Sequence, residues 1–194
     1  MLASPPPDLA TLSLDVVQVD PAACVRITRY PDTEPFFGKT GGNRFDDPLR
    51  EYGVCYAGDD FLVAFAESIL HDAVAVSGGF RVAESELLAR HVVAFDGSEL
   101  ALADLTGIPL KRLGGTNDIS SEVPYDMPQR WSRTVYAHPS NVDGLRYVSR
   151  HLNIGFAFAL FDRAQVRMRR GTSVPLTEHP QLAAALVQFN IALL

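Results

Sequence analysis

Glu67 is a carboxylate in the middle of the segment FLVAFAESILHD, whose apolar residues extend almost all the way round a helix. At roughly 100° per residue, Leu62, Phe65 and Ile69 fall on one side of that helix and Glu67 falls on the other. Helices with so little polar surface are usually buried, and a buried carboxylate is costly unless it is paired or hydrogen-bonded. Glu67 is therefore either a solvated residue on a half-covered helix or a carboxylate held for chemistry.

Three arginines, Arg26, Arg29 and Arg44, precede that helix. Arg26 lies in a strand-like run of apolar residues, so its guanidinium needs an acceptor, whereas Arg44 closely follows two glycines that let backbone approach a ligand. A planar guanidinium can engage two phosphate oxygens at once. Each arginine can equally be a structural ion-pair partner, and Arg44 has Asp46 and Asp47 beside it.

Tyr56 and Ser149 are further polar residues near strand ends. The ring of Tyr56 can stack on a planar ligand or pack in the core, and its hydroxyl needs a partner if buried. Ser149 and Arg150 are predicted on opposite faces of a strand. The chain has no GxSxG, and its five histidines have no HExxH spacing. A serine-hydrolase triad and a metal centre are therefore not expected.

Composition narrows the class of protein. The chain has 194 residues, 47% of them apolar, and a formal net charge of −6. This length favours one domain, and the acidic balance disfavours direct nucleic-acid binding. We find neither an apolar run of about 18 residues nor a secretory leader, so a cytoplasmic protein without membrane contact is expected. Cys24 and Cys55 lie in apolar stretches and are predicted to be buried thiols.

The elements that must position these residues are short. Residues 1–7, with three consecutive prolines, are predicted to be a flexible lead-in to one domain over residues 8–194. Asp60 is the predicted N-cap of the helix over residues 60–72, and residues 31–47 are predicted to be a loop. Further helices are expected over 126–139 and 179–194, with a short helical turn over 98–107. Strands are expected over 12–19, 22–30, 52–57, 78–85, 88–97, 144–151, 153–161, 164–170 and 171–176.

Strands thus dominate without a regular βαβ rhythm, which favours an α+β fold with largely antiparallel pairing over a doubly wound sheet. The nucleotide-binding fingerprints GxGxxG and GxxxxGK[ST] are both absent. If the chain binds a nucleotide, other residues must therefore hold its phosphates.

The order of these segments resembles the RES domain family, named for its recurrent Arg, Glu and Ser. The likeness rests on VRITR, a loop with phenylalanine and glycine that ends in GGNRFDD, the run YGVCYAGDDFLVAFAESILHD, and DGLRYVSRH. It spans roughly residues 22–161, and its most specific part is the run that holds Tyr56 and Glu67. Many members have GGRWN where this chain has GGNRF, which leaves open whether Arg44 reaches a pocket.

The resemblance implies a set of site residues. Catalytic roles are implied for Glu67, Arg26 and Tyr56. NAD-binding roles are implied for Arg44, Ser149, Arg29 and Gly38. Arg29 competes with Arg26 for the family's arginine position, and Ser149 is expected to donate to a phosphate or amide oxygen of NAD. No metal is implied.

The family's fold is similar to that of ADP-ribosyltransferase toxins, with a split, mainly antiparallel sheet and a cleft for NAD. The resemblance implies a toxin that depletes NAD by cleaving the nicotinamide–ribose bond, by hydrolysis or phosphorolysis. Transfer of ADP-ribose to a protein is the alternative in the same cleft, and a non-catalytic NAD-binding or partner-docking module is the alternative of another class. The implied protein partner is a helix-turn-helix antitoxin within a larger complex.

Overall fold

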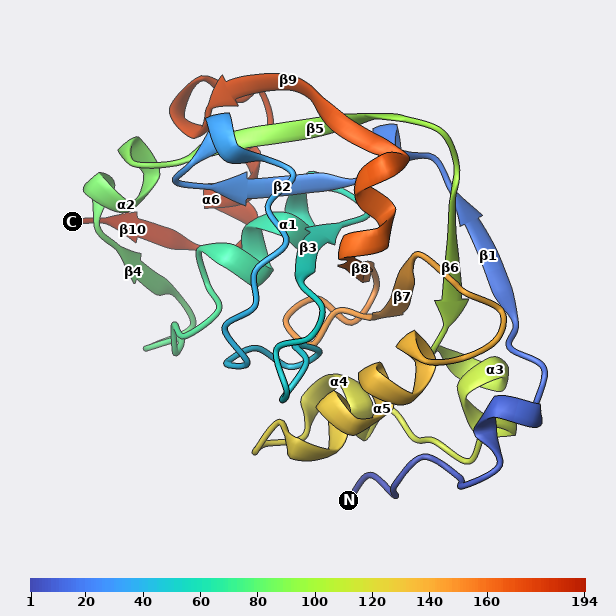
Figure 1. Ribbon diagram of the computed structural model, residues 1–194. Helices are drawn as coiled ribbons and strands as arrows, with labels where there is room; N and C mark the ends of the chain where they lie inside the picture. Colours follow the sequence, from blue (N-terminus) through green and yellow to red (C-terminus); the bar gives the residue numbers. More distant parts are fainter.

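A computed structural model describes residues 1–194 and contains an eight-stranded sheet with a second, two-stranded sheet beside it (Figure 1). The order of the large sheet is β1-β6-β7-β8-β3-β2-β5-β9. Its strands are Val16–Val19 (β1), Val25–Thr28 (β2), Val54–Gly58 (β3), His91–Gly97 (β5), Leu100–Asp104 (β6), Gly144–Val148 (β7), Phe156–Phe161 (β8) and Met168–Pro175 (β9). Only β6 and β7 pair in parallel within it. The predicted α+β class with mainly antiparallel pairing is confirmed.

The large sheet is split between β2 and β3. These strands pair only at Val25 and Gly58, after which β2 continues beside β5 and β3 continues beside β8. Figure 1 shows β2 and β5 running together in one half of the sheet, with β3 turning away toward β8. The split leaves strand edges inside the molecule whose polar groups need other partners.

Helix α1, Phe61–Ser68, lies against β2 and β3 at this split. It begins as predicted at Asp60, whose carboxylate accepts a hydrogen bond from the Val63 amide at 2.7 Å. It ends earlier than predicted, and His71 lies in the turn that follows. Phe61 and Phe65 bury the apolar face, which leaves Glu67 on the side away from that core.

The segment 98–107, predicted to be a helical turn, instead forms β6, so this prediction is wrong. Leu100 and Leu102 are fully buried, and the strand is paired on both edges, with β1 and with β7. A short apolar run of this kind has no periodicity that separates a buried strand from a buried helix. The parallel β6–β7 pair requires a crossover, which α3 (Gly107–Arg112), α4 (Asp118–Ser121) and α5 (Asp126–Tyr136) supply.

The C-terminal segment, predicted to be one helix over residues 179–194, contains a helix and a strand. Helix α6, Leu182–Gln188, ends before Asn190, whose φ of 50° lies in the left-handed region. Strand β10, Ile191–Leu193, then pairs in parallel with β4, Phe80–Val82. Helix α2, Glu84–Leu88, follows β4 directly. The residues predicted as two strands over 164–176 form a turn of 3₁₀ helix and then β9.

The first three residues, which belong to the segment predicted to be a flexible lead-in, contact distant parts of the chain. Leu2 is 2% exposed and belongs to the largest buried cluster. Trp131 donates its indole N–H to the carbonyl oxygen of Ala3 at 2.8 Å, and the Met1 ammonium pairs with Asp118 at 2.7 Å. The three prolines did not indicate these contacts, because Trp131 and Asp118 lie more than a hundred residues further along the sequence.

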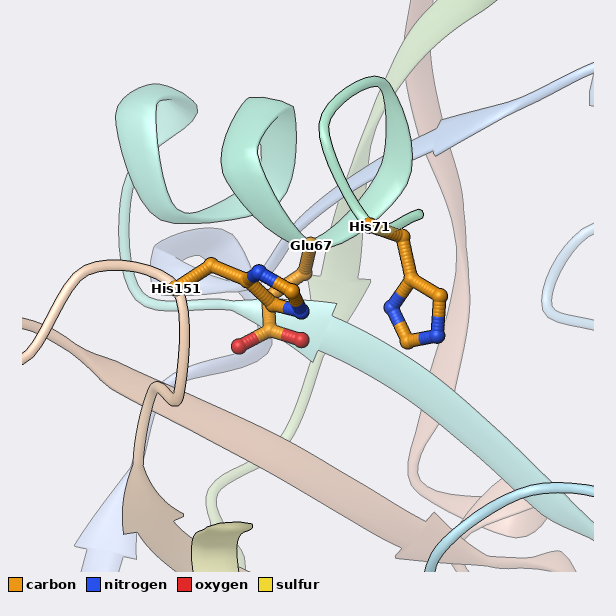
Figure 2. A group of neighbouring side chains, drawn as sticks. All are labelled: Glu67, His71 and His151. Atoms are coloured by element: carbon orange, nitrogen blue, oxygen red, sulfur yellow. The ribbon is translucent and has the colours of Figure 1, made fainter. Parts of the chain in front are cut away.

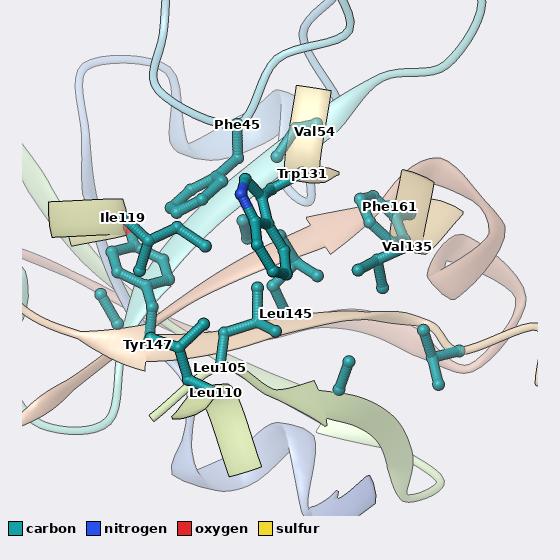
Figure 3. Close-up of a cluster of buried hydrophobic side chains, with 14 of the residues drawn as sticks. Phe45, Val54, Leu105, Leu110, Ile119, Trp131, Val135, Leu145, Tyr147 and Phe161 are labelled. Atoms are coloured by element: carbon teal, nitrogen blue, oxygen red, sulfur yellow. The ribbon is translucent and has the colours of Figure 1, made fainter. Parts of the chain in front are cut away.

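The largest apolar cluster surrounds Trp131 on α5 and packs between that helix and the sheet (Figure 3). Two smaller clusters fill the rest of the interior. Cys24 and Cys55 are free and buried, as predicted, and burial raises the pKa of Cys24 to about 12 and that of Cys55 to about 11. None of the helices is both long and apolar enough to cross a membrane.

Candidate functional site

A cavity of about 440 Å³ opens where β2 and β3 separate. This volume lies within the range of about 300–1,000 Å³ that small-molecule sites occupy. The charged residues among its lining are Arg26, Arg44, Glu67, Asp72 and Arg150. Three guanidinium groups thus line this one cavity, although the chain as a whole carries a net charge of −6. Such a lining suits an anionic ligand that also has a group to place beside a carboxylate.

Arg26 joins the two halves of the split sheet. From β2 its Nε donates to Glu34 at 2.6 Å, and its Nη1 donates to the carbonyl oxygen of Tyr56 on β3 at 2.6 Å. The Glu34 side chain is only 1% exposed, so this is a buried ion pair. Two of the five guanidinium N–H groups are thereby used, and the other three have no partner in the protein. Arg26 is both a structural partner and a cavity residue.

Arg44 also reaches the cavity, although the glycine loop departs from the family pattern. Its Nη1 donates to the carbonyl oxygen of Glu122 at 2.7 Å, and its guanidinium lies 4.6 Å from the centre of the Tyr125 ring. It pairs with neither Asp46 nor Asp47, so the structural alternative considered for it is wrong. Burial lowers the pKa of Arg44 below its ordinary value, yet an arginine remains charged at neutral pH.

The loop that carries Arg44 is held by the buried carboxylate of Asp46. One oxygen accepts hydrogen bonds from the hydroxyl of Thr40 and from the backbone and side-chain nitrogens of Asn43. The other accepts from the Tyr56 hydroxyl at 2.9 Å. Gln129 on α5 donates to two carbonyl oxygens of the same loop. These bonds fix the loop from inside the protein.

Tyr56 lines the cavity, whereas its hydroxyl is used within the fold. The hydroxyl donates to Asp46 and accepts from the Phe45 amide at 3.0 Å. Burial raises the pKa of Tyr56 well above its ordinary value, so the phenol is neutral. A contact with a ligand must therefore be made by the aromatic face.

Glu67 and Ser149, 82 residues apart in sequence, form a direct hydrogen bond. The Ser149 hydroxyl donates to Oε1 of Glu67 at 2.6 Å and accepts from the Leu152 amide at 3.0 Å. Glu67 lines the cavity and is only partly exposed, so the exposed-residue alternative is wrong. Ser149 is 1% exposed and does not line the cavity. The one proton of Ser149 is given to Glu67, and the expected donation to a phosphate or amide oxygen of NAD stays a prediction.

Two other implied site residues lie outside the cavity lining. Arg29 follows β2 and pairs with Glu86 at 2.6 Å, with both side chains more than 40% exposed. Gly38 exchanges backbone hydrogen bonds with Val54. Of the two competing arginines, Arg26 is the one that lines the cavity.

The structure adds His71 and His151, which the search for metal-binding motifs did not reveal. His71 follows Glu67 by four residues and His151 follows Ser149 by two, so proximity to these two residues was the available signal. Figure 2 shows both imidazoles beside the Glu67 carboxylate, and the three donor atoms all lie within 4.8 Å of one another. Burial lowers the pKa of His151 below its ordinary value.

Comparison with known proteins agrees with this architecture. The sequence matches the RES domain family over residues 23–179. A Sinorhizobium fredii (strain NBRC 101917 / NGR234) protein named "Probable toxin y4kH" is 30% identical over 121 residues, which cover 61% of this chain and 94% of that protein. In fold, the chain is similar to a chain of the Mycobacterium tuberculosis MbcT-MbcA toxin-antitoxin complex, with a TM-score of 0.65 and 16% identity over 87% of this chain and 92% of that chain.

These comparisons agree on one assignment. The matched region holds Arg26, Glu67 and Ser149, and it runs from just before β2 to the 3₁₀ turn that follows β9. The structural likeness fits the mainly antiparallel α+β fold that the family resemblance implied. This chain belongs to the RES domain family.

Proposed function

We propose that this protein is the toxin of a toxin–antitoxin pair and depletes NAD by cleaving its nicotinamide–ribose bond, with water or inorganic phosphate as the acceptor. The observation that carries this proposal is the shared cavity, in which the oriented carboxylate of Glu67 faces the same space as Arg26 and Arg44. The toxin names of the relatives support the general role.

The chemistry of the bond explains why one carboxylate suffices. Nicotinamide leaves as a neutral ring from a cationic precursor, so its departure needs no general acid. Positive charge then develops on the ribose, as in other glycosyl transfers with an oxocarbenium-like transition state. Glu67 would stabilise this charge and accept hydrogen bonds from the ribose hydroxyls. Ser149 acts as a positioning residue, because its hydrogen bond holds one carboxylate oxygen and leaves the other for the substrate.

The cationic residues would hold the diphosphate of NAD. Arg26 has three N–H groups left after its structural bonds, and Arg44 is anchored by one N–H and by the Tyr125 ring. Paired guanidinium groups supply here what backbone amides at a helix start supply in other dinucleotide sites. The ring of Tyr56 would pack against a planar part of the substrate.

The test is a time course of NAD and its products with the purified protein, in the presence and absence of phosphate. Glu67→Gln keeps the size of the side chain and removes its charge, so turnover should fall by about 10²–10³-fold. Glu178→Gln, on an exposed glutamate outside the cavity, is the matched control and should keep the wild-type rate. A near-normal rate in Glu67→Gln would refute the assignment.

The same assay separates the alternatives. Free ADP-ribose indicates hydrolysis and its 1″-phosphate indicates phosphorolysis. Label from NAD retained on a protein band would instead indicate ADP-ribosyl transfer. Binding of NAD without release of nicotinamide would indicate a non-catalytic module.

We also propose an antitoxin protein as the partner, since the fold is similar to a chain that was solved in a toxin–antitoxin complex. A helix-turn-helix protein encoded beside this chain is the expected form of that partner. Co-purification of the two proteins, with NAD turnover measured before and after mixing, tests the pairing. Full turnover in a stable complex of the two would contradict neutralisation.

A further inference from the structure

We propose that Glu67, His71 and His151 form a binding site for a transition-metal ion, with Zn²⁺ the best fit, and that the bound ion switches off the cavity's chemistry. The inhibitory part rests on the proposed function, because it requires Glu67 to act in NAD cleavage. The metal-binding part stands on the geometry of the three side chains alone.

The donor set is one that Zn²⁺ prefers. Two imidazole nitrogens and one carboxylate oxygen, with the fourth position left to water, are the ligands of a common class of zinc site. Their atoms lie within 4.8 Å of one another, and a tetrahedral ion with bonds of about 2.0–2.1 Å would bring them to about 3.3 Å. The donor atoms must therefore approach one another by at most about 1.5 Å.

His71 is placed to make that movement. Its side chain is 43% exposed and lies in the turn after α1, outside the helix that holds Glu67. Its nearest carboxylate is that of Asp72, 3.9 Å from Nε2 and beyond hydrogen-bond distance. The His71 ring already faces His151, with 5.1 Å between ring centres (Figure 2).

His151 supplies an independent indication of a ligand. Its Nε2 is buried and has no hydrogen-bond partner in the protein. Buried polar atoms are rarely left without a partner, and a metal ion at this position would provide one. Glu67 is oriented in the manner of a metal ligand, because Ser149 holds its second oxygen.

An ion at this position would oppose NAD cleavage for two reasons. It would occupy the carboxylate oxygen that Ser149 leaves free, which is the oxygen proposed to face the ribose. It would also place positive charge where positive charge must develop in the transition state. Arg44 and Arg150 line the same cavity, so the ion should be bound less tightly than in a purely structural zinc site.

Binding is tested first, without reference to activity. The protein over residues 1–194, treated with a chelator and then freed of it, is titrated with Zn²⁺ by calorimetry and with Co²⁺ by visible absorption, whose d–d bands report coordination. One equivalent should bind, and His71→Gln and His151→Gln should each weaken binding at least tenfold. His91→Gln, a histidine outside the cavity lining, is the matched control and should bind as the wild type does. Circular dichroism establishes that each variant is folded.

Inhibition is then read as the ratio of NAD turnover with and without Zn²⁺ within each protein. Turnover with Zn²⁺ divided by turnover without it should be about 0.1 or less in the wild type. The same ratio should stay near one in His71→Gln, whatever the basal rate of that variant. Absence of saturable binding, or binding that both histidine variants retain, would overturn the site. Binding without any change in the ratio would overturn the inhibitory role. A protein that binds Zn²⁺ but never cleaves NAD would refute the proposed function and leave the metal site standing.

Discussion

The buried ion pair between Arg26 and Glu34 allows a quantitative prediction about folding. Arg26→Met removes the cation from a carboxylate whose side chain is only 1% exposed. Breaking a buried pair from one side costs about 3–5 kcal/mol, because the remaining charge is left uncompensated. For a chain of this length each kcal/mol lowers the melting temperature by roughly 2–4 °C, so a decrease of about 6–20 °C is expected.

The double variant Arg26→Met/Glu34→Met separates the ion pair from the other hydrogen bonds of these two side chains. Removing both charges avoids the uncompensated carboxylate, and such replacements are often close to neutral. The carbonyl of Tyr56 still loses its donor from Arg26, and the Phe36 amide loses its acceptor on Glu34. Each loss costs about 1–3 kcal/mol if no water replaces the partner. The double variant should therefore be more stable than Arg26→Met alone.

Urea and thermal unfolding at neutral pH, followed by circular dichroism, measure both variants against the wild type. A loss below about 1 kcal/mol in Arg26→Met, as for solvent-exposed pairs, would refute the buried-pair reasoning. So would a double variant less stable than the single one. Because Arg26 also lines the cavity, any loss of turnover in its variants must be compared with these stabilities.

Three further predictions follow from single contacts. Ser149→Ala removes a hydrogen bond to a charged group worth about 1.5–3 kcal/mol, so kcat for NAD should fall about ten- to hundredfold while the melting curve still shows a folded protein. Tyr56→Phe should destabilise the protein by about 1–3 kcal/mol in urea unfolding, because the buried Asp46 carboxylate loses a donor. Burial raises the pKa of Cys24 to about 12 and that of Cys55 to about 11. A raised pKa keeps both thiols protonated at pH 8, so mass spectrometry should find alkylation by iodoacetamide only after denaturation.

Local signals predicted much of the fold. The N-cap at Asp60 and the strand before it placed Glu67 on α1, and the breaks at glycine and proline located most strands. The errors occurred at β6 and β10, where pairing with distant strands decides the conformation. The burial of Leu2 was not predicted for the same reason, since it depends on residues that are distant in sequence.

The site was predicted in part, by resemblance more than by spacing. Arg26, Arg44, Tyr56 and Glu67 do meet at one cavity, while the bond that makes Ser149 a partner of Glu67 could be seen only in three dimensions. The histidines beside Glu67 were missed because a motif search reads one segment at a time. Here the two imidazoles come from separate segments, one after α1 and one after β7.

The network around Asp46 has a thermodynamic consequence for recognition. The loop that carries Arg44 is hydrogen-bonded to Tyr56 on β3 and to Gln129 on α5. The entropy cost of ordering this loop is therefore part of the folding free energy and not of the binding free energy. A ligand that meets this preorganised loop loses little affinity to the entropy of ordering it. The turn that holds His71 also lines the cavity but has no side-chain hydrogen bonds of this kind, so conformational adjustment of the cavity should be concentrated there.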